Sequence, residues 1–453
     1  MSEPRVVVVG GGLAGLAAAL SCADGGARVT LLEARPRLGG ATFSFQREGL
    51  RVDNGQHVFL RCCVAYLRFL DRVGSRDLVF LQDRMAIPVL APGRTAQWLR
   101  RTALPAPLHL ARSLASYGFL APAERARAVV AALALGRMDP RDPRLDGQTF
   151  GAWLASRRQS PAAVEGLWNL IALPTLNLPA DQASLALAVK VFRTGLLEHR
   201  DAADIGYARA PLSEIHGESA ARALDEASAQ VLLRAAVRRI DPRPELKGFE
   251  LETEVDRMEA DAVIVAAPHD RAAEILPAGA VPDAAALASL GSSPIVNVHV
   301  VYDRRVTDLP FAAGLDTAVQ WVFDRTEQSG LEGGQYLAVS ISGADREIGE
   351  PTADLRERFL PALASLFPRA RSARVERFFV TREPHATFRQ APGSGALRPG
   401  PVTGVPGLFL AGAWTDTGWP ATMEGAVRSG FAAAREALVS VGRTRRLPEV
   451  VAA

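Results

Sequence analysis

The first forty residues carry the strongest pattern of apolar and polar positions in the chain. Four consecutive valines occupy positions 6–9, three glycines follow at 10–12, and positions 13–24 are mainly alanine and leucine. A short uninterrupted apolar run predicts a strand buried on both faces, and the stretch after the glycines predicts a helix. A second strand is expected at 29–32. The N-terminus is therefore predicted to form a parallel strand–turn–helix–strand unit.

Later segments extend this unit and interrupt it twice. Strands at 230–233, 259–268 and 407–412 and helices at 213–227 and from 421 onward predict a doubly wound sheet. A hairpin is expected at 43–52, and β-branched and aromatic runs at 294–302, 319–323, 336–341 and 375–381 predict a second sheet beside a helix at 352–367. Helices are expected at 107–120, 122–138 and 184–192. The predicted α/β fold has a Rossmann-type domain (1–85, 209–290 and 391–453) interleaved with a helical part (86–208) and a sheet (291–390).

The glycine turn has the spacing that a bound pyrophosphate requires. Gly10 allows the tight turn, Gly12 lets a phosphate approach the main chain, and Gly15 lets helix and strand pack closely. The main-chain N–H groups at the start of the helix, at Leu13 and Ala14, are free to bind an anion. The turn therefore predicts a dinucleotide site.

The residue that ends the second strand refines this prediction. Glu33 follows Gly15 by eighteen residues, and a carboxylate at this place accepts hydrogen bonds from a ribose 2′-OH. We therefore expect a dinucleotide whose adenosine ribose carries no phosphate.

Composition narrows the class of protein. The 453 residues are 48% hydrophobic and carry a net charge of only +3, which does not suggest a nucleic acid partner. Cys22, Cys62 and Cys63 form an odd set without metal-ligand spacing, so we predict no metal site and a reducing compartment. We also expect neither secretion nor a membrane span, because no run of eighteen apolar residues and no leader pattern is present.

Two further motifs carry a resemblance to a known family. The segment 33–41, with its E-x-x-x-R-x-G-G spacing, and the block at 408–430, L-F-L-A-G followed by T-M-E-G-A-x-x-S-G, resemble the amine oxidase and phytoene desaturase superfamily of FAD enzymes. The resemblance implies an amine oxidase-like fold with FAD as cofactor. It also implies cofactor contacts from residues along the whole chain: Gly10, Gly12, Leu13, Ala14, Gly15, Glu33, Ala34, Arg37, Gly39, Gly40, Ala41, Gln56, His57, Val237, Gly412, Ala413, Met423 and Glu424. Ala413 departs from the family pattern, because relatives usually carry an acidic residue there.

A narrower resemblance comes from the segment D-N-G-Q-H-V-F at 53–59 and the loop at 412–430, which resemble the hydroxysqualene dehydroxylases. This implies reductive removal of an allylic hydroxyl group in squalene and hopanoid biosynthesis. As a hypothesis, a side chain protonates the hydroxyl, an allylic cation forms, and reduced flavin delivers hydride. His57 and Asp416 are the candidate acids, although either residue can instead have a structural role. Phe59, Asn169, Trp414 and Trp419 are candidate substrate-binding residues.

Two stretches in the helical part carry apolar faces flanked by arginines. The faces contain Leu110, Leu114, Tyr117, Val129 and Leu133, and we predict peripheral contact with the inner face of a bacterial cytoplasmic membrane. Packing within a helical bundle of the substrate domain is the more ordinary explanation, and both can hold together. An isoprenoid lipid is the expected substrate, and the sequence identifies no electron donor. Two other functions stay open, a carotenoid or phytoene-type desaturase and a non-enzymatic lipid-binding escort.

Overall fold

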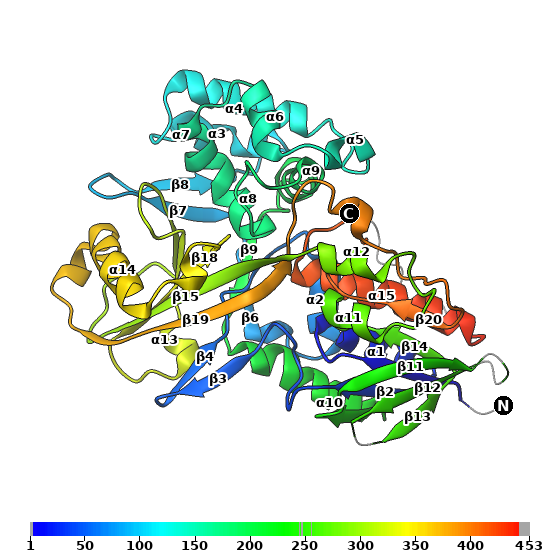
Figure 1. Ribbon diagram of the computed structural model, residues 1–453. Helices are drawn as coiled ribbons and strands as arrows, with labels where there is room; N and C mark the ends of the chain where they lie inside the picture. The colour runs from blue at the N-terminus through cyan, green and yellow to red at the C-terminus, as the bar shows by residue number, and fades with distance from the viewer. Residues whose placement is uncertain (1–2, 244, 246–247, 255, 444–453) are drawn as a thin grey trace.

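A five-stranded parallel sheet forms the centre of the computed structural model, which describes residues 3–243, 245, 248–254 and 256–443 (Figure 1). Val6 and Val8 point into a core shared with the helices, and Val7 and Val9 point into a core on the opposite face. The predicted strand buried on both faces is confirmed. The strands run in the order β10 (Gln230–Leu233), β2 (Arg28–Glu33), β1 (Arg5–Val9), β14 (Ala262–Val265) and β20 (Leu408–Leu410).

Helices cover one face of this sheet and a small antiparallel sheet covers the other. On the helical face, α1 (Leu13–Asp24) and α15 (Met423–Ser440) cross closely, because Gly430 lies against the main chain of Ala14. Figure 1 shows these first and last helices side by side. The helical face also includes α2 (Val64–Arg72) and α10 (Ser219–Glu226), and the other face is covered by β11 (Val237–Arg243), β12 (Gly248–Thr253), β13 (Arg257–Ala260), α11 (His269–Ile275) and α12 (Ala284–Ser289).

A seven-stranded mixed sheet forms the second layer of the molecule. Its strands run in the order β19 (Val375–Phe388), β15 (Ser292–Tyr302), β18 (Gln335–Ser342), β17 (Trp321–Asp324), β16 (Phe311–Gly314), β7 (Ala86–Leu90) and β8 (Gln97–Arg100), and α14 (Thr352–Leu366) packs on it. The four predicted strands of this sheet are present. The sequence analysis did not predict β7, β8 or β16, and β7 joins residues 86–90 to this sheet instead of to the helical part.

The helical part packs around an aromatic core. Phe150, Trp168 and Phe192 meet with ring centroids 5.2–5.8 Å apart. The predicted helix at 107–120 is shorter than expected, because Tyr117 leaves the helical conformation and the next residue is a glycine. The helices are α3 (Ala111–Ser116), α4 (Pro122–Leu135), α5 (Pro143–Asp146), α6 (Phe150–Ser156), α7 (Pro161–Ala163), α8 (Asn169–Leu176) and α9 (Leu185–Phe192).

Two small sheets connect these layers. The predicted hairpin is formed by β3 (Ser44–Arg47) and β4 (Leu50–Asp53), and a three-stranded antiparallel sheet has the order β5 (Val58–Leu60), β9 (Ile205–Ala208) and β6 (Val79–Leu81). β9 is the segment on which the chain returns from the helical part to the central sheet. Within the part of the chain that the structure describes, no helix combines the length and the apolar character needed to cross a membrane.

Candidate active site and cofactor site

The glycine turn forms a cradle with a second glycine pair; we call Gly10–Gly12 together with Gly39 and Gly40 the glycine cradle. Gly10 has φ +112°, and its N–H donates to the carbonyl of Leu32 over 2.7 Å. Gly39 donates to the carbonyl of Gly11 over 2.9 Å, which holds the two glycine segments together. A Cβ at Gly40 would lie 2.7 Å from the Cα of Gly12, so no side chain fits between them.

Gly12 faces open space, which is the property that a cofactor site needs. A Cβ built there would meet only the Cα of Gly40, at 3.7 Å. The N-terminus of α1 begins at the next residue, Leu13, and Ala14 follows, so main-chain N–H groups lie beside this space. Gly15 contacts the carbonyl of Gly10, where a side chain would collide. The cradle therefore fits a pyrophosphate group held by main-chain atoms.

Glu33 lies beneath the cradle at the end of β2. Its carboxylate is buried and accepts hydrogen bonds from the N–H of Gly11 over 2.6 Å and of Arg35 over 2.7 Å. A carboxylate oxygen has more than one lone pair, so these bonds orient Glu33 and still leave acceptor capacity for a ribose hydroxyl. Val237, the predicted adenine contact, begins β11 two residues after Ala235, whose N–H donates to the carbonyl of Glu33.

Arg37 supports the second glycine pair from behind. Its guanidinium donates to the carbonyl of Gly40 over 3.0 Å and stacks 3.4 Å from the centroid of the Phe43 ring. Burial lowers the pKa of Arg37 below its ordinary value. Ala34 and Ala41, also predicted cofactor contacts, are exposed on either side of this segment.

The D-N-G-Q-H segment is anchored to the second sheet and to the loop that carries Ala41. The side-chain amide of Asn54 donates to the carbonyl of Ala41 over 2.9 Å. The main-chain carbonyl of Asn54 accepts from the side chains of Asn297 and Thr381 over 3.2 Å each. The two donors come from β15 and β19. Gln56 and His57 directly follow this anchored segment, so the second sheet sets their position relative to the glycine cradle.

Asp53, the first residue of the segment, forms a buried ion pair with Arg325. The two side chains are 5% and 7% exposed and their charged atoms are 2.5 Å apart. Asp53 also accepts from the hydroxyl of Ser44 over 2.6 Å and the N–H of Leu212 over 3.0 Å, and Arg325 donates to the carbonyl of Ala208 over 3.1 Å. The pair therefore ties β4, the return strand β9 and the second sheet together at one point.

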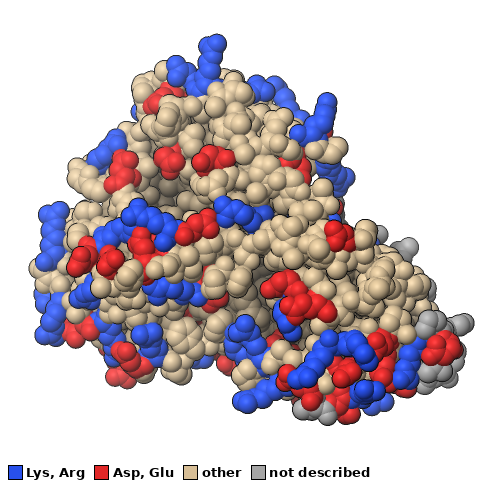
Figure 2. Space-filling model, viewed as in Figure 1, with Lys and Arg blue, Asp and Glu red and all other residues tan. Residues whose placement is uncertain are grey.

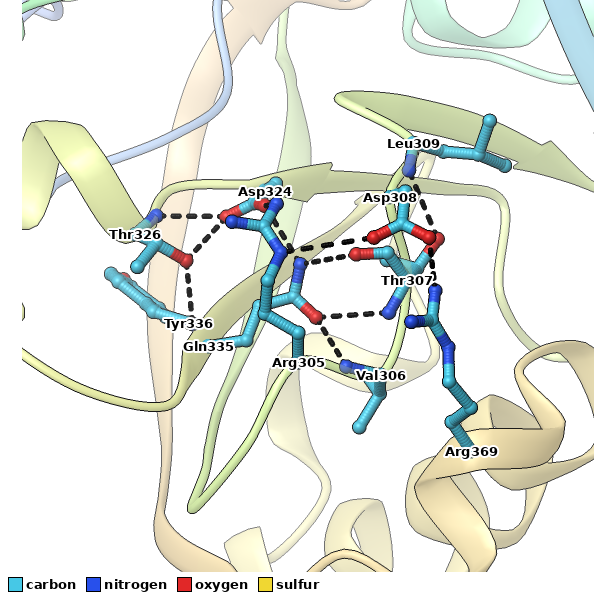
Figure 3. Close-up of polar contacts among 10 residues, drawn as sticks. All are labelled: Arg305, Val306, Thr307, Asp308, Leu309, Asp324, Thr326, Gln335, Tyr336 and Arg369. Carbon is cyan, nitrogen blue, oxygen red and sulfur yellow. Dashed lines mark hydrogen bonds and ion pairs between the residues drawn. The ribbon is translucent and has the colours of Figure 1, made fainter.

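A polar network in the second sheet holds Asp324 and Thr326, the two neighbours of Arg325 in the chain (Figure 3). Gln335 is fully buried, accepts from the N–H groups of Val306 and Thr307, and donates to Asp324 over 2.7 Å. Asp324 in turn accepts from the N–H of Thr326 over 3.0 Å. Both neighbours of Arg325 are thus fixed, which leaves its side chain directed toward Asp53.

His57 is part-exposed, yet burial lowers its pKa below the ordinary value. Its Nδ1 lies 3.3 Å from the carbonyl of Gly55, so Nδ1 carries the proton there and Nε2 is left as an acceptor. The arrangement favours a neutral imidazole at neutral pH. Asp416, the other predicted acid, is exposed and accepts from the N–H of Gly418 over 3.0 Å, which is the structural role left open above.

The C-terminal motif brings the start of α15 toward the site. Thr422 caps the helix by accepting from the N–H of Gly425 over 3.1 Å, and Met423 is the first helical residue. Gly412 lies two residues after the end of β20 and has φ +142°, and Ala413 follows it with part of its surface exposed. The N-terminus of an eighteen-residue helix stabilises negative charge placed near it.

The side chain of Glu424 does not point toward a cofactor. It is 1% exposed, accepts from the N–H groups of Ala65 and Tyr66 over 3.1 and 2.8 Å, and pairs with Arg428 over 2.6 Å. Burial raises its pKa above the ordinary value. This carboxylate caps the start of α2, so the main-chain N–H is the part of Glu424 that is left for the predicted cofactor contact.

The predicted substrate-binding residues lie inside packed cores. Phe59 is buried with its ring 5.1 Å from that of Tyr66, and Trp414 is buried over Gly412 with its indole N–H donating to Ala267. Asn169 is also buried, and its amide bonds Glu165 and the N–H of Ala180. Trp419 is packed between the cationic groups of Lys190 and Arg428. These four side chains have structural partners, and their contact with a substrate stays a prediction.

Arg398 organises the C-terminal loop, and the sequence analysis missed it. It is 7% exposed, and no carboxylate among the described residues forms an ion pair with it. It donates instead to the carbonyls of Thr415 over 2.6 Å, Trp419 over 2.8 Å and Trp414 over 3.3 Å. Burial lowers its pKa below the ordinary value. No local pattern marks this residue, because its partners lie 16 to 21 positions further along the chain.

The parallel sheet, the glycine cradle and the separate seven-stranded sheet are typical of a dinucleotide-dependent oxidoreductase. A family model described as flavin containing amine oxidoreductase matches residues 13–438. The chain belongs to this family, and its cofactor is FAD.

Individual relatives and a solved structure are similar to this protein over nearly the whole chain. The hydroxysqualene dehydroxylase of Sinorhizobium fredii is 30% identical over 96% of this chain and 98% of its own length. A zeta-carotene desaturase of Arabidopsis thaliana is 24% identical over 94% of this chain and 84% of its own length. Cyclohexylamine oxidase from Brevibacterium oxydans, at 20% identity, superposes with a TM-score of 0.72 over 98% of this chain and all of that structure, which concerns the fold.

Proposed function

We propose that this chain removes the allylic hydroxyl group of hydroxysqualene and forms squalene. The observation that carries the proposal is the 30% identity, over almost the full length of both chains, to a hydroxysqualene dehydroxylase. The glycine cradle, with open space in front of Gly12, supports the use of FAD in this reaction.

The reaction balances with one proton and one hydride. The allylic C–O bond breaks, the hydroxyl group takes up a proton and leaves as water, and a new C–H bond forms at the carbon. FAD, reduced by an external donor, supplies the hydride when bound. The protein must hold the cofactor, exclude bulk water and place a proton donor near the hydroxyl group.

His57 is the residue we propose for the proton transfer. The carbonyl of Gly55 orients Nδ1, so a proton taken up by the ring is carried on Nε2, the free edge of the imidazole. Burial lowers the pKa of this ring, so the protonated form is a stronger acid than an ordinary histidine and is present at lower pH. Asp416 is not retained in this role, because its carboxylate closes a turn on the surface of the loop.

The apolar substrate favours contact with a membrane surface. Removing a thirty-carbon hydrocarbon from water gains on the order of 20 kcal/mol at about 0.8 kcal/mol per carbon group, so such a lipid stays in the bilayer. We propose that the enzyme binds there through a lipid-facing patch, defined as the exposed apolar side chains of one region. The patch consists of Leu104, Leu108, Val129, Val130 and Leu133, and Val130 is 64% exposed.

This patch differs from the face expected from the sequence. Tyr117 is buried with its hydroxyl donating to Gly166, and Leu110 and Leu114 pack against the helical core. Arg101 is held by Asp204 over 2.6 Å. Exposed arginines nonetheless remain near the patch, including Arg112 and Arg127, and Figure 2 shows basic side chains around the helical part at the top of the view.

Product analysis tests the catalytic proposal. The purified protein with FAD and a chemical reductant is incubated anaerobically with hydroxysqualene, and squalene is measured by mass spectrometry. We expect squalene in proportion to FAD content. Lack of squalene together with oxidation of phytoene or zeta-carotene would instead support the desaturase function. The similarity to the Arabidopsis zeta-carotene desaturase is the reason for testing this alternative. Colourless protein that binds lipid but takes up no FAD would support the escort function.

Vesicle flotation tests the membrane proposal. The protein is expected to float with vesicles that contain anionic lipid, less so with neutral vesicles, and the Val130→Asp/Leu133→Asp variant is expected to stay at the bottom. Val439→Asp is the matched control, because Val439 is 58% exposed on α15, outside the lipid-facing patch. Equal flotation of the double variant and the control would contradict the assignment of the patch.

A further inference from the structure

The small sheet β5–β9–β6 has two faces of different character. On one face, Phe59 packs against Tyr66 in the core of the nucleotide domain, and Gly206 opposite it leaves room for the ring. The opposite face carries Val58, which is 37% exposed although its strand belongs to the small sheet that connects the main layers of the molecule. An apolar strand face that stays uncovered there needs an explanation.

The strand register places three apolar side chains in one line across that face. Val58 is paired with Tyr207, and Tyr207 is paired with Phe80 on its other side. Residues directly opposite one another in antiparallel strands point to the same face. Phe80 is 38% exposed, and its ring centroid lies 5.2 Å from that of Tyr207.

Two aromatic residues of the second sheet continue this line. The ring of Phe311 meets that of Tyr207 edge-on at 5.9 Å, and the ring of Trp321 lies 6.1 Å from Phe311. Trp321 and Tyr207 are both only partly buried. We call Val58, Phe80, Tyr207, Phe311 and Trp321 the aromatic row. It contains no charged side chain and spans the junction between the small sheet and the second sheet.

The first residue of the aromatic row directly follows the proposed proton donor in the chain. Val58 follows His57 directly, and the strand that carries it starts where the anchored D-N-G-Q-H segment ends. The other end is rigid, because Gln335 binds the main chain at Val306 and Thr307, just before Phe311, and Asp324 at the end of the strand of Trp321 (Figure 3). The row is therefore a fixed apolar surface that leads away from His57.

We propose that the isoprenoid chain of the substrate lies along the aromatic row, with its hydroxyl-bearing carbon at His57. This inference rests on the proposed function and names the residues that bind the lipid. A branched hydrocarbon matches the apolar surfaces of Val58, Phe80, Tyr207 and Trp321, which are exposed or partly exposed, and burying both surfaces is favourable. Phe311 is 2% exposed and supports the rings of Tyr207 and Trp321. The ring of Tyr207, which is paired with Val58, also suits an allylic cation, because aromatic rings attract positive charge. The row takes the place of the buried Phe59, Trp414 and Trp419.

Binding of squalene to the oxidised holoenzyme tests this inference without turnover. Squalene is presented in detergent micelles, and its dissociation constant is measured from the change in flavin absorbance. Val58→Trp obstructs the row beside His57, and Phe80→Arg places a charge in it, so each is expected to weaken binding at least tenfold. Tyr207→Phe removes only a hydroxyl group and is expected to bind within about twofold of the wild type.

Val439→Arg is the matched control, since it adds the same charge at an exposed valine outside the row. The FAD-to-protein ratio and the melting temperature show whether each variant is folded. Squalene binding by folded Val58→Trp and Phe80→Arg that equals the control would overturn the inference. The two proposals fail separately: wild-type protein that binds squalene through the row but makes none would disprove the proposed reaction alone.

Discussion

The buried ion pair between Asp53 and Arg325 allows the junction between the two sheets to be tested. In Asp53→Asn, the side-chain oxygen keeps the bonds from Ser44 and Leu212, but an NH₂ group then faces the guanidinium of Arg325. The variant leaves a positive charge buried without its partner. Removing one member of a buried pair costs about 3–5 kcal/mol of unfolding free energy.

The expected shift in melting temperature follows from the size of the chain. With about 2.1 cal/mol/K per residue, 453 residues have an unfolding entropy of about 1 kcal/mol/K. A loss of 3–5 kcal/mol therefore lowers the melting temperature by about 3–5 °C. The measurement is thermal unfolding of the FAD-saturated protein, followed by circular dichroism.

Two further variants separate the buried charge from other effects. Arg325→Met added to Asp53→Asn removes the unpaired charge, and we expect it to restore at least half of the lost stability. Arg72→Met breaks an exposed pair with Asp24 and is expected to cost less than about 1 kcal/mol. A melting temperature of Asp53→Asn within about 1 °C of the wild type, or a double variant as unstable as the sum of the single variants, would refute the reasoning.

Four other predictions concern the cofactor, the proton donor, the pH dependence and the loop. The added methyl group of Gly12→Ala fits the protein but occupies the open space in front of the glycine cradle. FAD affinity is therefore expected to fall at least tenfold, with little change in the stability of the apoprotein. Gly147→Ala is the control and is expected to change neither quantity. Because burial lowers the pKa of His57, kcat/KM is expected to fall as pH rises from below 6.5, and His57→Gln is expected to lose both the activity and this pH dependence. Burial lowers the pKa of His299 to about 3, so between pH 6.5 and 3 the unfolded chain binds a proton that the native state excludes. The free energy of unfolding is therefore expected to fall as pH drops through this range, by up to about 1.4 kcal/mol per pH unit. In His299→Gln, the dependence of the free energy of unfolding on pH, measured by urea unfolding, is expected to be smaller by this amount. Arg398→Met leaves three loop carbonyls without their buried donor, and a melting temperature equal to that of the wild type would contradict its proposed role.

The parts that were predictable depend on short-range pattern. The valine strand, the helix at 13–24 and the turn between them follow from adjacent residues, because four buried valines and a glycine spacing have few alternative structures. The four strands predicted in the second sheet follow from β-branched runs. The family motifs located the cofactor segments for the same reason, since each motif lies within one turn and its neighbouring elements.

The parts that were not predictable depend on pairing between distant residues. β16 pairs with β7, which lies more than two hundred positions earlier, and Arg325 forms an ion pair with Asp53, which is 272 positions away in the sequence. The burial of aromatic residues is also hard to predict, because neighbouring residues in a strand point to opposite faces. Phe59 is 4% exposed and Val58 is 37% exposed, and the sequence alone does not tell which face of the strand is the core.

The crossing of the first and last helices also constrains when the flavoprotein can form during synthesis. The central sheet needs residues 5–9 and 408–410, and the helix at Met423–Ser440 packs on the one at Leu13–Asp24. The hydrophobic core of residues 86–208 is formed mostly by residues of that segment, so it can pack before translation is complete. The valine strand can pair with β2 and β14 earlier, but the edge strand β20 and the helix that packs on Leu13–Asp24 are synthesised last, so we expect a translation product that stops before residue 423 to yield no yellow protein.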